Sequence, residues 1–141
     1  MTEPRWIPLP VVRAIHDRQI ARHGGAAGMR DRSLLEGALA RPVNRFGYGE
    51  TDLTVLAAAY AFGIAKAHAF VDGNKRTAFV TAVTFLRANG SKPTFDQVEI
   101  VRMMEGLASG RINEGRFKDW LCQELMIAQD NSANSDTSDR S

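Results

Sequence analysis

The sequence contains one cysteine, Cys122, and no long apolar run. Because a second thiol is missing, the chain can form neither an internal disulfide nor a cysteine metal cluster, and Cys122 is expected to be a passive packing residue. No stretch of about 18 uncharged apolar residues occurs, and the first residues lack the basic and then apolar regions of a signal peptide. We therefore expect a cytoplasmic protein with no membrane segment.

Net charge of either sign is small as well. The formal net charge is +2, a mild basic bias that suits an anionic ligand but is too weak to indicate nucleic acid. Basic and aromatic residues are not interleaved, as they are on many surfaces that bind single strands. We therefore expect no direct binding of nucleic acid.

A sustained period-two alternation of apolar and polar residues, typical of half-buried strands, is also absent. Apolar residues instead recur at helical spacing in almost every segment, which predicts an all-α fold, a compact bundle of about six helices. A chain of 141 residues suits one domain, which we place at residues 1–128. Residues 129–141 have no large apolar side chain, so we expect a disordered polar tail there.

Signals for helix starts and ends divide the domain further. We expect the first helix at residues 9–23 and a second from a cap at Asp31 or Ser33 to about residue 40. The third and fourth are expected at residues 51–67 and 74–89. A fifth should run from a Thr94–Gln97 capping box to about residue 107, and a sixth should start at a cap formed by Asn113. The fourth of these is apolar on most sides, so it is predicted to be the central, buried helix. Residues 41–50 lack helical periodicity and contain Pro42, which predicts an exposed flap.

The segment between the third and fourth expected helices reads HAFVDGNKR, from His68 to Arg76. Each residue has an ordinary explanation when taken alone: His68 can end a helix, Phe70 can fill the core, Asp72 with Gly73 can form a turn, and Asn74 can cap the next helix. Taken together, they place a base, a carboxylate, a glycine and two cations in one turn between helices.

A functional interpretation assigns a chemical role to the same residues. A helix that starts near Asn74 directs unpaired backbone N–H groups into the loop, and Gly73 allows close approach, which makes an anion site. Lys75 and Arg76 add positive charge, and Asp72 is the only carboxylate in the loop that could bind Mg²⁺ beside phosphates. His68 can accept a proton from an attacking hydroxyl. The set fits phosphoryl or nucleotidyl transfer from ATP.

The loop resembles the signature loop of the Fic/Doc family, and its Lys75 is similar to the Doc (death-on-curing) toxin branch of toxin–antitoxin systems. The resemblance extends to IHDRQIARHGG and GMRDRSLLEGALARP upstream and to NKRTAFVTAVTFLRANG downstream. It implies an all-helical Fic fold and a cognate antitoxin. Its site residues would be His68 as general base, Asp72 as Mg²⁺ ligand, Gly73, Asn74, Lys75 and Arg76 as the phosphate-binding group, and Phe70 as the anchor of the loop.

Two departures from the pattern of Fic nucleotidyl transferases bear on the reaction. This chain resembles those enzymes except at two positions. In them a glycine follows the asparagine of the loop, whereas this chain has Lys75. They also have a second arginine three residues after the first, whereas this chain has Phe79. The resemblance to Doc implies that ATP binds reversed, so that the γ-phosphate passes to a threonine of elongation factor Tu and translation stops. AMP transfer and a non-catalytic module that binds an anionic partner are the alternatives.

Residues outside the loop are less specific. Asn44, Arg45, Phe46 and Tyr48 could contact the target from the flap, although exposed charges beside a turn are usually only solvated. The roles of His16, Asp17 and Arg41 stay open. His16 with Asp17 resembles a matching pair in Doc proteins, but a structural role at a helix surface or in packing against the loop is favoured. Arg41 could reach a phosphate or the target, although an exposed charge beside a turn is usually only solvated. His23 beside Gly24 is expected to be a helix-end residue.

Overall fold

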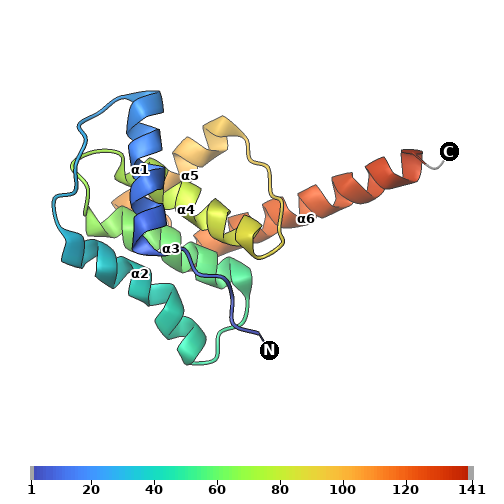
Figure 1. Ribbon diagram of the computed structural model, residues 1–141. Coiled ribbons are helices and arrows are strands. Elements are labelled where there is room, and N and C mark those ends of the chain that lie inside the picture. Colours follow the sequence, from blue (N-terminus) through green and yellow to red (C-terminus); the bar gives the residue numbers. More distant parts are fainter. Residues whose placement is uncertain (1, 140–141) are drawn as a thin grey trace.

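The computed structural model describes the backbone of residues 2–139 and the side chains of residues 2–126. Within this part of the chain six helices form a compact bundle, as predicted: α1 Leu9–His23, α2 Arg32–Gly47, α3 Leu53–Ala67, α4 Asn74–Ala88, α5 Gln97–Ser109 and α6 Glu114–Asp139 (Figure 1). The same residues contain no strand, only an isolated antiparallel bridge between Met29 and Phe70. None of the described helices is long and apolar enough to cross a membrane.

Most of the predicted helix ends are confirmed. Gly24 ends α1 with φ of 80°, and Asp31 caps α2 by accepting a hydrogen bond from the Leu34 N–H at 3.1 Å. The Ser33 hydroxyl and the Leu34 N–H hold the pKa of Asp31 below its ordinary value. Asn113 caps α6 through the Arg116 N–H at 2.8 Å.

The predicted capping box of α5 is wrong. Asp96, rather than Thr94, accepts the hydrogen bond from the Glu99 N–H at 3.3 Å, and the helix begins at Gln97. A carboxylate at this position also interacts favourably with the positive end of the helix dipole, which an uncharged hydroxyl does not. The cap therefore lies two residues later than the sequence pattern indicated.

The predicted flap is also wrong for most of its length, because α2 continues through Pro42 to Gly47. A proline leaves the carbonyl four residues before it without its helical N–H, here that of Ala38. Gly63 of α3 packs against this carbonyl: a Cβ atom at Gly63 would lie 3.1 Å from the Ala38 oxygen. Pro42 is buried inside this helix, and only a short turn after Gly47 remains of the flap.

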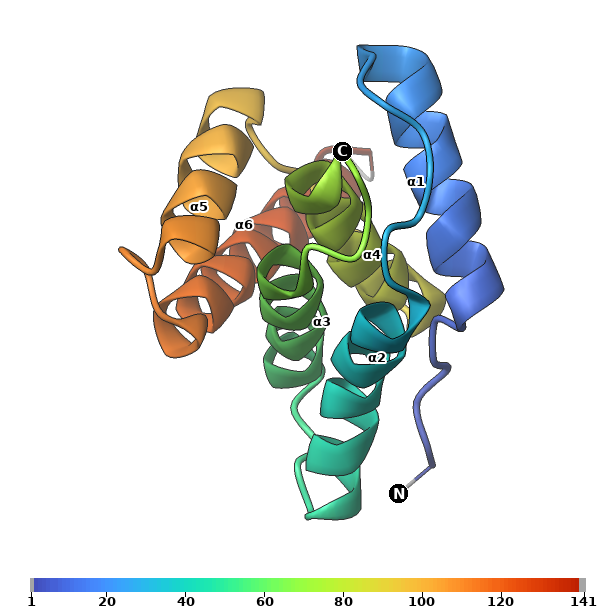
Figure 2. The same cartoon turned by 90° about the vertical axis from the view of Figure 1, so that its left-hand side faces the viewer.

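The central position belongs to α3 more than to α4, contrary to the prediction. The α3 helix packs against α2, α4, α5 and α6, whereas α4 packs against α1, α3 and α5. Figure 2 shows α3 between α2 and the pair formed by α5 and α6. Small side chains explain this placement, since Ala57, Ala58, Ala59, Ala61 and Ala65 are buried and allow neighbours on several sides.

Beyond Ala128, α6 continues to Asp139 and extends away from the bundle in Figure 1. The disordered polar tail expected for residues 129–141 stays a prediction, and residues 140 and 141 lie outside the described part of the chain. The boundary between domain and tail stays a prediction.

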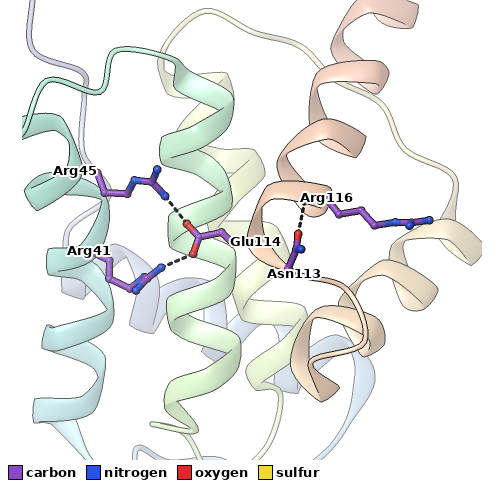
Figure 3. A network of polar contacts seen from close by, with 5 residues as sticks. All are labelled: Arg41, Arg45, Asn113, Glu114 and Arg116. Carbon is purple, nitrogen blue, oxygen red and sulfur yellow. Dashed lines mark hydrogen bonds and ion pairs between the residues drawn. The ribbon is translucent and has the colours of Figure 1, made fainter.

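Glu114, at the start of α6, ties the end of α2 to the sixth helix. Its carboxylate accepts hydrogen bonds from the guanidinium groups of Arg41 and Arg45, and the Arg45 Nη1 to Glu114 Oε2 distance is 2.9 Å (Figure 3). Arg41 also lies over the ring of Phe62, 4.7 Å from its centroid. Both arginines are thus engaged within the protein, and any contact of Arg45 with a target stays a prediction.

Glu114→Gln is expected to lower the free energy of unfolding by about 1 kcal/mol, because one half-buried carboxylate joins two arginines. The matched control is Glu36→Gln, which breaks an exposed pair with Arg32 one helical turn away and is expected to cost about 0.3–0.5 kcal/mol. Urea unfolding of both variants measures the difference. Equal losses would show that the link between α2 and α6 contributes nothing beyond an ordinary surface pair.

Candidate active site at the loop between α3 and α4

The loop from His68 to Gly73 is held in shape by its own residues. His68 ends α3 in the left-handed region, with φ of 50° and ψ of 43°, which is unusual for a residue with a side chain. Asn74 closes the loop: its side-chain oxygen accepts from the Phe70 N–H at 3.1 Å, and its amide donates to the Phe70 carbonyl at 2.9 Å. Phe70 itself is only 2% exposed and belongs to the core, as predicted.

The connection between α1 and α2 lies alongside this loop. Gly28 and Arg30 exchange backbone hydrogen bonds with it, from the Val71 N–H to the Gly28 carbonyl at 3.1 Å and from the Arg30 N–H to the Ala69 carbonyl at 2.7 Å. The Arg30 guanidinium donates to the carbonyl of His68 at 3.1 Å. These bonds hold the left-handed residue in place from a segment far away in the sequence.

Asp72 is exposed, but its orientation is set by the same segment. Its Oδ2 atom accepts a hydrogen bond from the Ala26 N–H at 2.7 Å. Gly25 permits this approach, since a Cβ atom there would lie 3.2 Å from the Asp72 Cβ, and its φ is 113°. The second oxygen of the carboxylate takes part in no hydrogen bond with the described residues and is therefore able to bind a cation.

The first turn of α4 has the features of an anion site. Gly73 precedes the helix with φ of 78°, and in the described part of the chain no side chain caps that turn. The N–H groups at the start of such a helix lack internal partners and carry the positive end of the dipole. Lys75 and Arg76 are exposed at the same turn, so backbone and side chains place positive charge together.

These residues line one large cleft. It has a volume of about 970 Å³ and is bounded by the end of α1, by the loop and by the facing sides of α4 and α5. Asp72 to Arg76 form its polar end, joined by Arg22 and His23 of α1, while the apolar lining is Phe79, Val80, Ile100, Val101 and Met104. One hollow therefore combines a positively charged helix start with an apolar surface, an arrangement that suits a nucleotide.

The structure brings together most, but not all, of the predicted site. Asp72, Gly73, Asn74, Lys75 and Arg76 share the cleft, whereas His68 is exposed on the same loop and does not line the cleft. The four flap residues lie apart from it. Arg45 and Tyr48 line a second hollow of about 480 Å³, Tyr48 is 93% exposed, Asn44 is exposed in α2, and Phe46 packs against Trp6 with ring centroids 5.7 Å apart.

Sequence reasoning missed the residues that support the loop from outside. Ala26, Gly28 and Arg30 hold its backbone, and Arg22 lines the cleft. The glycines at 24, 25 and 28 were the available signal, since a run of glycines between helices often marks a place where backbones approach closely. Because Gly24 and Gly25 also suit the end of a helix, that interpretation conceals their role in letting the two backbones approach closely.

Comparison with known proteins shows the family of the chain. A family model described as the Fic/DOC family matches residues 6–86, more than half of the chain. The protein named protein kinase doc, from Escherichia phage P1, is 40% identical over 109 residues, which cover 77% of this chain and 86% of that protein. The protein named toxin Doc, from Mycolicibacterium smegmatis, is 47% identical over 70 residues, or 48% of this chain and 53% of that protein. The matched region contains the whole loop from His68 to Arg76, and the chain belongs to the Fic/Doc family.

Proposed function

We propose that this protein is a Doc-type toxin that acts as an ATP-dependent protein kinase. The γ-phosphate of ATP would pass to a serine or threonine hydroxyl of a translation factor, with elongation factor Tu as the expected target. The observation that carries the proposal is the uncapped start of α4 beside Lys75, Arg76 and Asp72 in one cleft. The similarity to the phage protein named a kinase, over 77% of this chain, supports it further.

The phosphates of ATP would occupy the polar end of the cleft. The N–H groups at the start of α4 donate to phosphate oxygens, and Gly73 lets those oxygens approach the backbone. Lys75 and Arg76 offset the negative charge that spreads over the phosphoryl oxygens during transfer. The apolar lining from Phe79 to Met104 is available to the base of the nucleotide.

Asp72 fits the requirements of a Mg²⁺ ligand. One of its oxygens is held by the Ala26 N–H and the other is available, so a cation there would meet an oriented carboxylate. Mg²⁺ in nucleotide sites commonly takes one or two carboxylates, with phosphates and water as its other ligands. When bound, the ion would neutralise phosphate charge, and the role of Asp72 is to place it beside the anion site.

His68 is proposed as the general base. Its exposed position on the loop suits a hydroxyl that belongs to another protein, which reaches the site from outside the cleft. The hydroxyl oxygen bonds to the γ-phosphorus, the bond to the bridging oxygen of ADP breaks, and the hydroxyl proton passes to the imidazole. A neutral imidazole can accept that proton.

Lys75 and Phe79 favour phosphoryl transfer over AMP transfer. The lysine side chain fills space that a glycine would leave open at the anion site, and Phe79 is almost completely buried and carries no charge. A second phosphate-binding arginine is therefore missing from α4 at that position. A nucleotide that must leave room for Lys75 is expected to present its terminal phosphate to His68.

Parallel assays with ATP labelled on the α- or the γ-phosphate test the reaction, with Mg²⁺ and purified elongation factor Tu. We expect label from the γ-phosphate alone to reach the target. Label from the α-phosphate would assign AMP transfer instead. If neither label is transferred, elongation factor Tu is not a substrate of this chain.

Asp72→Asn is expected to raise the Mg²⁺ concentration required for half-maximal transfer by at least about tenfold, because a ligating charge is lost. The amide oxygen can still accept from the Ala26 N–H, so the loop should keep its shape. Asp119→Asn, on the exposed side of α6, is the control and should leave the Mg²⁺ dependence unchanged. An unaltered Mg²⁺ requirement in the Asp72 variant would remove this residue from the metal site.

A toxin implies a cognate antitoxin. We expect that protein to fold a short segment into the cleft and so to block ATP or the target. A cytoplasmic location is part of the same proposal, because the expected target acts in translation. Loss of γ-label transfer on adding the antitoxin, with recovery on its removal, is the direct check.

A further inference from the structure

His16 is the most completely buried titratable side chain near the loop, and the proposed reaction does not use it. It lies in the middle of α1 and is only 1% exposed. Its neighbour Asp17 is 80% exposed, and the two side chains are 3.8 Å apart, beyond hydrogen-bond distance. A partly polar ring in the core needs a partner there, since an unsatisfied buried polar group is destabilising.

The partner of the imidazole is the backbone of Asp72. The Nε2 atom of His16 lies 2.7 Å from the Asp72 carbonyl oxygen. A carbonyl only accepts, so this contact requires the tautomer or charge state in which Nε2 carries the hydrogen. The hydrogen bond joins α1 directly to the residue that offers its carboxylate to the cleft.

The imidazole also contacts the loop on both sides of Asp72. It stacks on Phe70 with ring centroids 3.9 Å apart and planes 9° from parallel. At Gly73, a Cβ atom would lie 3.6 Å from Cδ2 and Nε2 of the same ring. One side chain of α1 thus borders the core anchor, the candidate metal ligand and the residue that begins α4.

We propose that His16 is a positioning residue of the candidate active site. Its Nε2–H bond sets the orientation of the Asp72 peptide, and its ring, held against Phe70, sets how far the loop stands from α1. The carboxylate of Asp72 and the first N–H groups of α4 are attached to that same stretch of backbone. This inference deepens the proposed kinase function and rests on it, because it assigns His16 a role in placing the metal and phosphate groups.

Three substitutions separate the hydrogen bond from the packing. His16→Gln carries an amide nitrogen at about the reach of Nε2, whereas the shorter His16→Asn reaches only about as far as Nδ1. Both lose the stacked ring, so their folded states should be weakened in similar measure. His16→Phe keeps the ring and loses the donor, which leaves the Asp72 carbonyl without its partner.

The test measures γ-phosphate transfer as a function of Mg²⁺, the affinity for Mg²⁺ and ADP by calorimetry, and the thermal midpoint of each full-length variant. We expect His16→Asn and His16→Phe to need on the order of tenfold more Mg²⁺ for half-maximal transfer, as for other residues that orient a metal ligand. The Mg²⁺ concentration that His16→Gln needs for half-maximal transfer should stay within about threefold of that of the unsubstituted protein, because the amide keeps part of one hydrogen bond.

The pattern across variants decides the outcome. If activity in all three falls only in step with the thermal midpoint, His16 is an ordinary core residue and the proposal is overturned. Equal Mg²⁺ requirements for His16→Gln and His16→Asn would overturn it as well. Should the unsubstituted protein transfer no phosphate to elongation factor Tu, the proposed target fails, and the affinity for Mg²⁺ and ADP decides the role of His16 by the same comparison. Absence of that binding in the unsubstituted protein overturns both.

Discussion

His68→Ala is expected to lower the rate of γ-phosphate transfer by about 10²–10⁴-fold, the usual contribution of a positioned general base. The proton of the attacking hydroxyl would lose its acceptor, while the anion site at the start of α4 stays intact. Affinity for Mg²⁺ and ATP should therefore change little, so the loss should appear in kcat rather than in KM. Initial rates over a range of ATP concentrations measure both quantities.

Backbone geometry supplies the control for this substitution. Because His68 is left-handed, alanine there adds strain to the loss of the imidazole, whereas asparagine tolerates that region better. His68→Asn should thus be more stable than His68→Ala and equally inactive. Activity retained in the asparagine variant would show that the imidazole serves to shape the loop, not to accept a proton.

Phe70→Ala is expected to lower the free energy of unfolding by about 3–5 kcal/mol, as for other large-to-small changes in a core. Its ring is nearly completely buried and stacks on His16, so the substitution leaves a cavity next to the loop. Domains of this size are stable by only about 5–15 kcal/mol. Much of the total stability would be lost, and denaturant unfolding measures how much.

Phe95→Ala is the matched control for Phe70. Phe95 also belongs to an aromatic cluster, packing edge-on against Phe79 at 5.1 Å, but it is only partly buried. Its loss should cost less than that of Phe70. Phe70→Leu should recover most of the stability because it refills the space. Similar losses for Phe70→Ala and Phe95→Ala would contradict the view that Phe70 anchors the loop.

Local signals in the sequence were sufficient for most of the helix boundaries. Gly24, Asp31 and Asn113 act through their own conformation or through hydrogen bonds to the next turn, so their effect does not depend on the rest of the fold. Pro42 is different, because the free-energy cost of a proline inside a helix depends on what packs beside that helix. The close packing of Gly63 of α3 against Ala38 of α2 is a contact between two helices, and the sequence pattern does not reveal it.

The candidate site divides in the same way. Residues 72–76 are adjacent in the chain, and the start of a helix is itself an anion site, so their grouping followed from sequence. The roles of His16, Ala26 and Arg30 required knowledge of where α1 and its following connection pack. Such contacts between distant segments leave no periodic pattern in the sequence.

The division of the site between two distant stretches of chain has a consequence for its dynamics. Its supporting hydrogen bonds span 38 to 56 residues, and most come from a glycine-rich connection that is not helical. Segments with few packed side chains open more readily than the helices around them. A brief local opening of residues 24–31 would thus free the Asp72 carboxylate and the His68 carbonyl together, while the bundle stays folded and His16 still holds the Asp72 carbonyl.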